Sequence, residues 1–206
     1  MNKAVKVNKT SLAVILFSIL LYLSSFLYIE PSTIGIVNSA GFPIVLQNMI
    51  AVCAGILLGG PQGSASVGLY IMLGALGLPV FSSGPFSAVQ GLARLTGQSG
   101  GFILGYFFAA AASGFIMGRP LNEKPSVKKL IKASAAGYGL IYIFGISQFL
   151  SLKGFTLSLQ NIKLIFTVVV LPYLPLDIIK LIVTVITGFF FRPLVARTFF
   201  SSSEKI

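Results

Sequence analysis

The segment that decides the fold is residues 174–195, "LPLDIIKLIVTVITGFFFRPLV". Its length suits a bilayer crossing, which takes about 20 residues of α-helix, and nearly all of its side chains are apolar. It nevertheless carries Asp177, which is the only aspartate in the chain, and Lys180 three residues later. Residues three apart share one face of a helix. The segment therefore predicts a membrane-spanning helix with two opposite charges side by side at membrane depth.

The composition of the whole chain extends this interpretation beyond one segment. The 206 residues are 55% hydrophobic and only 9% charged, whereas a soluble domain is typically about a quarter charged. The apolar runs are continuous and do not alternate with a period of two, as the strands of a membrane β-barrel would. We therefore expect an all-α integral membrane protein in which residues 1–206 form a single transmembrane domain.

Hydropathy and length predict about six transmembrane helices, over residues 11–29, 44–60, 64–81, 100–118, 131–151 and 174–195. The first of these runs is too long for the core of a typical signal peptide, so it is expected to remain as the first helix. The stretch "NIKLIFTVVV" at 161–170 is too short to cross a membrane alone. It predicts an interfacial or re-entrant segment, or an extension that Pro172 and Pro175 interrupt.

The basic residues predict the orientation in the membrane. The chain has 15 Lys and Arg against 4 Asp and Glu, for a net charge of +11, but these residues lie between apolar runs and form no continuous stripe for nucleic acid. With the N-terminus inside, eleven fall in inside segments, and three (Arg94, Lys153 and Lys163) fall outside. Cytoplasmic loops carry such an excess. We expect a multi-pass protein of the cell membrane with both termini cytoplasmic and no nucleic-acid partner.

The sequence lacks the residues that several kinds of chemistry need. There is no histidine, and the single cysteine, Cys53, lies in an apolar run, so neither a metal site nor an intrachain disulfide is expected. No Walker A motif is present, so any ATP hydrolysis belongs to another subunit. A membrane hydrolase or lipid-modifying enzyme needs a nucleophile and a base, which one aspartate without histidine supplies poorly. We expect no enzymatic activity and no cofactor.

The Asp177–Lys180 pair has a structural and a functional interpretation. A helix that begins near Pro175 places Asp177 in its first turn, where free N–H groups stabilise a carboxylate. In the structural interpretation Asp177 only caps this helix and neutralises Lys180. However, a charge at the centre of a membrane helix costs about 2.5–3.5 kcal/mol, and such residues commonly mark functional sites. We favour a ligand site that opens to the outside and binds a molecule with hydrogen-bond donors and acceptors.

Other polar and aromatic side chains are candidates for the same site. Gln47, at the start of the second expected helix, either contributes its amide to a ligand or lies at headgroup level. Arg94 lies in the Gly-rich stretch "FSSGPFSAVQGLARLTGQSGG" (81–101) and either holds an anionic group or is solvated. The aromatic candidates either line an apolar pocket or pack the core; they are Tyr70, Phe81, Tyr106 and Tyr142. Small residues three or four apart elsewhere predict close helix packing.

Three stretches, taken in this order, carry a family resemblance. They are "FPIVLQNMIAVCAGILLGGPQGSASVGLYIMLGALGLPVF" (42–81), "GQSGGFILGYFFAAAASG" (97–114) and "LPYLPLDIIK" (171–180). Together they resemble the BioY family, the biotin-specific S components of energy-coupling factor (ECF) transporters. The most specific parts are "GLPVF", the Gly-rich start of the fourth expected helix and the pattern P-x-x-P-x-D-x-x-K.

Two features depart from the family pattern. The family commonly shows Gly-Pro-Thr-Gly-Gly where this chain has Gly-Gln-Ser-Gly-Gly at 97–101. S components also tend to show alanines four apart in the first helix, on the face that docks on the transmembrane coupling subunit. Here Ala13 is followed four residues later by Phe17, so the resemblance does not assign that docking face.

The resemblance implies a six-helix S component that captures biotin on the outer face and delivers it with an ECF module of a transmembrane coupling subunit and two ATPases. By similarity, Asp177 accepts the N–H groups of the biotin ureido ring and Lys180 donates to its carbonyl. The carboxylate tail is expected to meet Gln47, Arg94 or the backbone near the loop glycines. The remaining ligand-binding candidates are Gly97, Gly100, Gly101, Phe81 and Tyr106.

Other functions stay open at this point. The chain is either an S component for biotin, an S component for another small vitamin, or a solitary transporter without an ATPase partner. A structural or assembly protein, in which the Asp177–Lys180 pair only joins helices, predicts that neutralising both charges is tolerated. For a transporter, the glycine-containing loops 30–43 and 82–98 are the expected gates.

Overall fold

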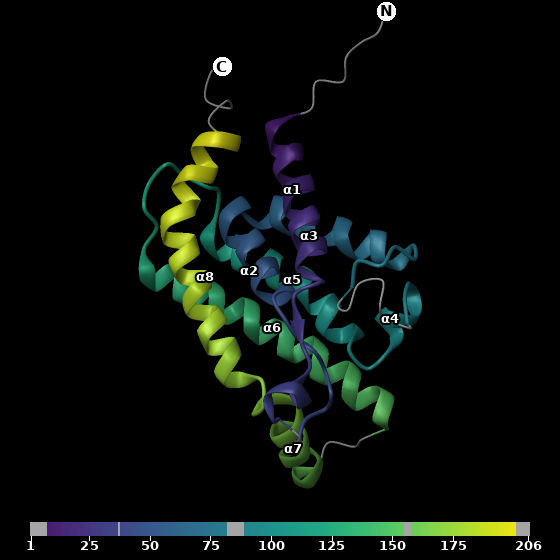
Figure 1. The fold of residues 1–206 in the computed structure, drawn as a ribbon. Helices are drawn as coiled ribbons and strands as arrows, with labels where there is room; N and C mark the ends of the chain where they lie inside the picture. Colours follow the sequence, from purple (N-terminus) through teal and green to yellow (C-terminus); the bar gives the residue numbers. More distant parts are fainter. Residues whose placement is uncertain (1–7, 37, 82–88, 155–157, 201–206) are drawn as a thin grey trace, which may run out of the picture.

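The structure is a computed structural model that describes residues 8–36, 38–81, 89–154 and 158–200. It is an elongated bundle of helices in which α1 begins and α8 ends at one end of the molecule, while α7 lies at the other (Figure 1). The helices are α1 (Lys9–Ser24), α2 (Gln47–Leu58), α3 (Gly60–Ala75), α4 (Leu92–Thr96), α5 (Gly100–Met117), α6 (Val127–Lys153), α7 (Leu159–Ile165) and α8 (Leu174–Val195).

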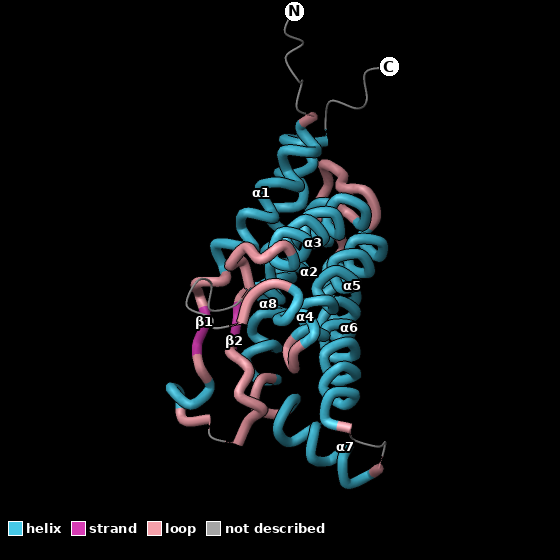
Figure 2. Tube along the Cα trace, turned by 90° about the vertical axis from the view of Figure 1, so that its right-hand side faces the viewer, coloured by secondary structure: helices cyan, strands magenta, loops and turns pink. Residues whose placement is uncertain are grey.

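Short elements complete the fold. A 3-10 turn, η1 (Pro31–Ile34), follows α1, and the π-helical stretches η3 (Phe166–Val170) and η4 (Ala196–Phe200) extend α7 and α8. Two strands of two residues, β1 (Tyr28–Ile29) and β2 (Ile44–Val45), pair antiparallel beside the bundle (Figure 2). The expected fold class, an all-α membrane bundle, is confirmed. The strand pairing and the one-turn helix α4 were not predicted, because each is too short to leave a periodic signal.

The helices overlap all six expected ranges; α8 has the expected bounds, 174–195, and the other five differ from theirs. In the described residues, α5, α6 and α8 with η4 are long and apolar enough to cross a membrane, whereas α1, α2 and α7 with η3 are shorter apolar helices. The range expected at 44–60 contains α2, which ends at Leu58, because Gly59 takes a φ of 85° and turns the chain into α3. This left-handed conformation is open to glycine at little cost. The stretch 161–170, expected not to cross alone, belongs to α7 and η3.

Helix α2 lies at the centre of the bundle and is buried along almost its whole length. Its neighbours approach closely, because glycines replace side chains at the contacts. A Cβ atom on Gly55 would lie 2.1 Å from the backbone oxygen of Ala110 in α5, and one on Gly114 would lie 2.5 Å from the backbone nitrogen of Gly60 in α3. Helices α2, α3 and α5 therefore meet backbone to backbone, as the spacing of small residues predicted.

Arg192 joins three helices at the end of the bundle that carries the termini. Its side chain is only 3% exposed, although the sequence places it among the inside cations. Its guanidinium donates hydrogen bonds to the backbone oxygens of Ile56 in α2 and of Met117, Gly118 and Arg119 at the end of α5. The last carbonyls of a helix lack partners within the helix, so Arg192 acts as a cap that ties α8 to α2 and α5.

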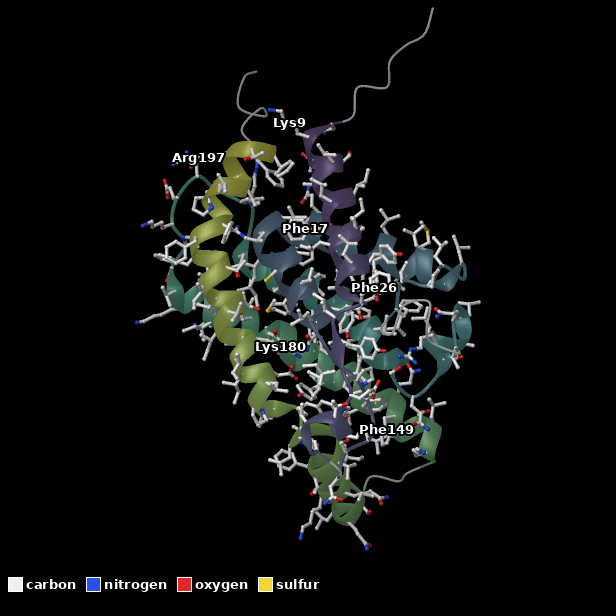
Figure 3. The ribbon with its side chains drawn as sticks, in the orientation of Figure 1. Lys9, Phe17, Phe26, Phe149, Lys180 and Arg197 are labelled. Carbon is white, nitrogen blue, oxygen red and sulfur yellow. The ribbon has the colours of Figure 1, made fainter. Side chains whose placement is uncertain are left out.

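Labelled side chains mark the two ends and the middle of the bundle. Lys9 and Arg197 lie at the end where α1 begins, Phe149 lies toward the opposite end, and Lys180 lies between them (Figure 3). Of the basic residues counted on the inside, Lys3, Lys6 and Lys205 lie outside the described residues. The charge distribution predicts cytoplasmic termini, which would place the end that carries α7 on the outer side.

Candidate ligand site

A cavity lies between α2, α5, α6 and α8, behind the segment that precedes α2. It holds about 630 Å³ of space not occupied by atoms, counting the part that is open to solvent. Its lining is mostly apolar and aromatic, with a polar group at α8. The lining residues are Phe42, Pro43, Ile44, Val45, Asn48, Ser99, Phe102, Ile103, Tyr106, Ile141, Tyr142, Val169, Tyr173, Asp177 and Lys180.

Asp177 is the centre of the polar group. Its Oδ1 lies 2.9 Å from Nζ of Lys180 and 3.1 Å from Nδ2 of Asn48, while its Oδ2 lies 2.6 Å from the hydroxyl of Tyr142. Both Asp177 and Lys180 are only 9% exposed. Burying a charge is tolerable when it is paired and hydrogen-bonded. Three donors from α2, α6 and α8 therefore hold this carboxylate in place at the cavity wall.

The local sequence explains why α8 presents this pair. The helix begins at Leu174 with a proline in its first turn, a position where the missing N–H is no loss. Asp177 lies in the same first turn, where the helix dipole favours a negative charge. The buried face of α8 carries only polar residues and glycine along its whole length: Asp177, Lys180, Thr184, Gly188 and Arg192. This face turns toward α2 and α6, and the apolar residues of α8 are either partly buried against the core beside it, as Leu181, Val185 and Phe189 are, or exposed.

The polar group retains hydrogen-bonding capacity. A carboxylate offers about four acceptor positions, and three are used within the described residues. An ammonium can donate more than one hydrogen bond, and Lys180 donates only to Asp177 among the described residues. The site can therefore accept one further N–H from a ligand and donate to a ligand oxygen. The electrostatic arrangement suits a neutral polar group better than an ion, because the pair carries no net charge.

Aromatic side chains form the apolar wall beside this group. The ring of Phe42 lies 5.3 Å from that of Phe102 and 5.7 Å from that of Phe149, and Phe102 lies 6.4 Å from Tyr142. Ring pairs at these distances make favourable tilted or edge-to-face contacts. The wall is contributed by α5, α6 and the segment before α2. A ligand here meets polar atoms at one end and aromatic faces along its length.

The structure brings four of the sequence candidates together at the cavity: Asp177, Lys180, Tyr106 and Tyr142. Asn48, the neighbour of Gln47, was not a candidate, and its bond to Asp177 was not predicted. Phe42, Ser99 and Tyr173 were not candidates, although all three line the cavity. Their signal in the sequence is weak, because single aromatic or hydroxyl residues beside prolines and glycines are typical of ordinary loops.

Gln47 and Phe81 lie elsewhere, in the core between α1, α2 and α3. The Gln47 side chain is 1% exposed, and its amide nitrogen lies 2.7 Å from the hydroxyl of Tyr70 and 3.2 Å from the backbone oxygen of Val80. The Phe81 ring packs edge-to-face on Tyr70 at 5.6 Å and fills the space beside Gly74. Neither residue lines the cavity, because the amide and the ring are used to hold the end of α3 against α2.

Arg94 and Gly97 line a second hollow beside the cavity. The two spaces share Phe42, Pro43 and Ser99 in their walls, so the hollow adjoins the cavity. Of the Gly-rich loop proposed as a gate, residues 82–88 lie outside the described residues.

Gly100 and Gly101 serve packing. A Cβ on Gly100 would lie 1.7 Å from the backbone oxygen of Leu95, and one on Gly101 would lie 2.4 Å from that of Phe144. The side chain of Gln148 in α6 donates to the backbone oxygens of Leu95 and Gly97, each at 2.7 Å. The loop glycines therefore let the turn before α5 lie directly against α6, next to the cavity and not in its lining.

Fold and site together define a class: a helical membrane protein with a cavity for a small molecule that has a polar head and an apolar body. The sequence model of the BioY family matches residues 1–197. The chain therefore belongs to the BioY family.

Named relatives agree with this assignment. The biotin transporter BioY of Rhizobium etli is 31% identical over 73% of this chain and 79% of that protein. The biotin transporter BioY of Lactococcus lactis is 35% identical over 70% of this chain and 72% of that protein, and that of Thermotoga maritima is 31% identical over 68% and 75%. The relatives are transporters, and this chain is a transport component and not an enzyme.

A solved structure has the same architecture. It is the crystal structure of the S-component for biotin from an ECF-type ABC transporter. The two chains superpose with a TM-score of 0.73 and 27% sequence identity, over 97% of this chain and 99% of that one. The likeness therefore covers the bundle and the cavity together.

Proposed function

We propose that this chain is the biotin-binding S component of an ECF transporter, and that it captures biotin with high affinity in its outward-facing cavity. The observation that carries the proposal is the Asp177 group, a neutral and multiply hydrogen-bonded ion pair at the wall of an aromatic cavity. The relatives named as biotin transporters and the solved biotin S-component support the choice of ligand.

Biotin matches the two chemical halves of the cavity. Its ureido ring carries N–H donors and a carbonyl, and its bicyclic body is apolar. In our proposal Asp177 accepts a ureido N–H at its remaining acceptor position, and Lys180 donates to the carbonyl. The rings of Phe42, Phe102 and Tyr106 contact the bicyclic body. A site built on hydrogen bonds discriminates strongly, because an analogue that leaves a buried polar group unpaired loses about 1–3 kcal/mol for each such group.

We assign the carboxylate tail of biotin to Arg94. The hollow that contains Arg94 shares Phe42, Pro43 and Ser99 with the cavity, so a flexible tail can pass from one to the other. A guanidinium binds a carboxylate through paired hydrogen bonds. Gln47, another candidate, is engaged in the core with Tyr70 and Val80. In this proposal the tail lies in the adjoining hollow and the ureido ring lies at Asp177.

The proposal includes partners and a location. The chain carries no Walker A motif, so transport of biotin against its gradient takes its energy from another gradient or from another subunit. We propose a transmembrane coupling subunit and two ATPases, and a single transmembrane domain in the cell membrane with both termini cytoplasmic. Co-purification of ATPase subunits with the chain from its own cells tests these partners. Transport that persists in their absence would favour a solitary transporter.

A calorimetric titration tests the ligand. The chain is purified in detergent from biotin-depleted cells, shown to be free of bound ligand, and titrated with biotin, with desthiobiotin and with other small vitamins. Biotin is expected to bind most tightly, and desthiobiotin, which keeps the ureido ring, is expected to bind measurably. Folded, ligand-free protein that gives no heat with biotin but binds another vitamin would replace biotin in this proposal.

A further inference from the structure

One wall of the cavity is a short segment of residues 40–45, which we call the mouth segment. It supplies Phe42, Pro43, Ile44 and Val45 to the cavity lining. It belongs to no helix, and its last two residues pair with β1. Figure 2 shows the strand β2 and the loop before it on the side of the bundle that leads down to α7. A ligand that enters or leaves on this side of the cavity moves along or displaces this wall.

One tyrosine fixes the peptide units of the mouth segment. The hydroxyl of Tyr173 donates to the backbone oxygen of Phe42 at 3.0 Å and accepts from the backbone nitrogen of the same residue, also at 3.0 Å. The backbone nitrogen of Ala40 donates to the backbone oxygen of Val168 at 2.8 Å. Three hydrogen bonds thus join this segment to η3 and the start of α8, and two of them depend on a single side-chain oxygen.

Tyr173 also belongs to the turn that presents Asp177. The backbone nitrogen of Asp177 donates to the backbone oxygen of Tyr173 at 3.0 Å, and both side chains line the cavity. The residue that holds the mouth segment and the residue that meets the ligand head are therefore one helical turn apart. A movement of the mouth segment away from Tyr173 would remove one wall of the cavity without breaking the hydrogen bonds of Asp177 to Lys180 and Tyr142.

The mouth segment has few buried contacts, as expected of a segment that opens locally. Phe42 and Tyr173 are only partly buried, and the Phe42 ring lies in a small cluster separate from the main core, with Phe149, Ile165 and Val169. Segments with few buried contacts open at a lower free energy than the core. Loss of two hydrogen bonds therefore lowers the free energy needed to open this segment. The helices that carry the polar group are held by the main core and are not affected.

We propose that Tyr173 is a positioning residue that latches the mouth segment to α8, and that release of this latch sets the rate at which ligand enters and leaves. The inference rests on the proposed function, because it takes biotin as the ligand that passes the mouth. It assigns to the Tyr173 hydroxyl a role in exchange kinetics that is separate from contact with the ligand head.

The test compares Tyr173→Phe with Tyr22→Phe as a matched control. Tyr22, in α1, loses the same hydroxyl, but this group has no hydrogen-bond partner among the described residues. Exchange of radiolabelled biotin is measured on purified protein in lipid nanodiscs. Tyr173→Phe is expected to raise the dissociation rate about tenfold and to raise the association rate as well, with Tyr22→Phe unchanged. A folded Tyr173→Phe protein with wild-type rates would overturn the latch.

Amide hydrogen exchange tests the latch without assuming that biotin is the ligand. In ligand-free protein, the amide of Phe42 is expected to exchange about tenfold faster in Tyr173→Phe than in wild type, while amides in α5 are unchanged. Equal exchange at Phe42 would contradict the latch. If wild type binds no biotin, the proposed function fails and this measurement still decides the latch.

A measurement on wild type alone covers the case in which Tyr173→Phe does not fold. Bound ligand should keep the latch closed, so biotin is expected to slow exchange of the Ala40 and Phe42 amides at least tenfold. Unchanged exchange at both amides in protein saturated with biotin would show that the mouth segment does not respond to the ligand, and would overturn the proposal.

Discussion

Lys180 and Asp177 lie one helical turn apart on the buried face of α8, with the lysine Nζ 2.9 Å from the carboxylate Oδ1. The carboxylate has two further hydrogen-bond donors, Asn48 from α2 and Tyr142 from α6. A helix cap alone would need neither of these partners. Their presence, at the wall of a cavity, favours a binding site over a purely structural pair.

The first prediction concerns the charge of Asp177. In Asp177→Asn the amide cannot accept as the carboxylate does, and Lys180 loses its ion-pair partner. Hydrogen bonds to charged groups contribute about 1.5–3 kcal/mol, so biotin affinity is expected to fall about 100-fold in calorimetric titrations. Glu30→Gln removes the charge of an exposed acid and is the control. Equal affinities in Asp177→Asn and wild type would exclude a ligand role for this carboxylate.

The second prediction separates binding from stability. Asp177→Asn alone leaves a buried ammonium unpaired, which is costly, and is expected to lower the melting temperature in detergent. Adding Lys180→Met removes that ammonium, so the double variant should regain most of the melting temperature. It should not regain biotin binding. A double variant with both wild-type stability and wild-type affinity would mean that the pair only joins helices.

The sequence could predict Asp177 and Lys180 because their chemistry is conspicuous. Two charges in an apolar run, three residues apart, have few neighbours that could satisfy them. Gln47 and Asn48 could not be told apart in this way. Both are amides at the start of one helix, and successive residues point about 100° apart around the helix axis. The amino-acid sequence does not indicate which of the two side chains faces α8. The structure was needed to place Asn48 at Asp177 and Gln47 in the core.

The fold was predictable to the level of its helices for a similar reason. Long apolar runs in a lipid environment can satisfy their backbone only as helices. The bounds of the helices and the short strands depend on contacts made after the chain has folded. The pairing of Tyr28 with Val45 and the turn at Gly59 join parts of the chain whose meeting no local pattern encodes. Arg192 likewise counted as a topology signal until its contacts were known.

The third prediction concerns Tyr142, whose hydroxyl lies 2.6 Å from Oδ2 of Asp177. Tyr142→Phe keeps the ring in the aromatic wall and removes only this donor. The carboxylate then becomes less well fixed, and biotin affinity is expected to fall about tenfold, which corresponds to ~1.4 kcal/mol. Tyr22→Phe is again the control for loss of a tyrosine hydroxyl. An unchanged affinity in Tyr142→Phe would show that Asn48 and Lys180 suffice to position Asp177.

The fourth prediction separates Arg192 from the ligand site. Arg192→Met would leave the backbone oxygens of Ile56 and Gly118 without this donor. Breaking charged hydrogen bonds in a buried setting is expected to lower the stability by ~3 kcal/mol, seen as a lower melting temperature in detergent. Arg197→Gln changes an exposed arginine on the same helical segment and should have a much smaller effect. Biotin affinity, measured on the folded fraction, should not change in either variant.

The last prediction tests the close packing of the helices with two glycines. An added Cβ at Gly114 would lie 2.5 Å from the backbone nitrogen of Gly60 and 2.6 Å from the backbone carbon of Gly59, whereas an added Cβ at Gly139 meets no atom within 4 Å. Backbone atoms cannot rotate away as a side chain can, so Gly114→Ala must push α5 from the start of α3. We expect Gly114→Ala to lower the melting temperature and the yield of monodisperse protein.

Gly139→Ala is the matched change in an open position. It exchanges glycine for a better helix former inside α6, which favours the helix by up to about 1 kcal/mol, so its melting temperature should equal or exceed that of wild type. Thermal unfolding followed by size-exclusion chromatography measures both variants in the same detergent. If Gly114→Ala and Gly139→Ala had the same melting temperature, the bundle would have room for a side chain where α5 contacts α3. That result would contradict the inferred backbone-to-backbone packing at this end of the molecule.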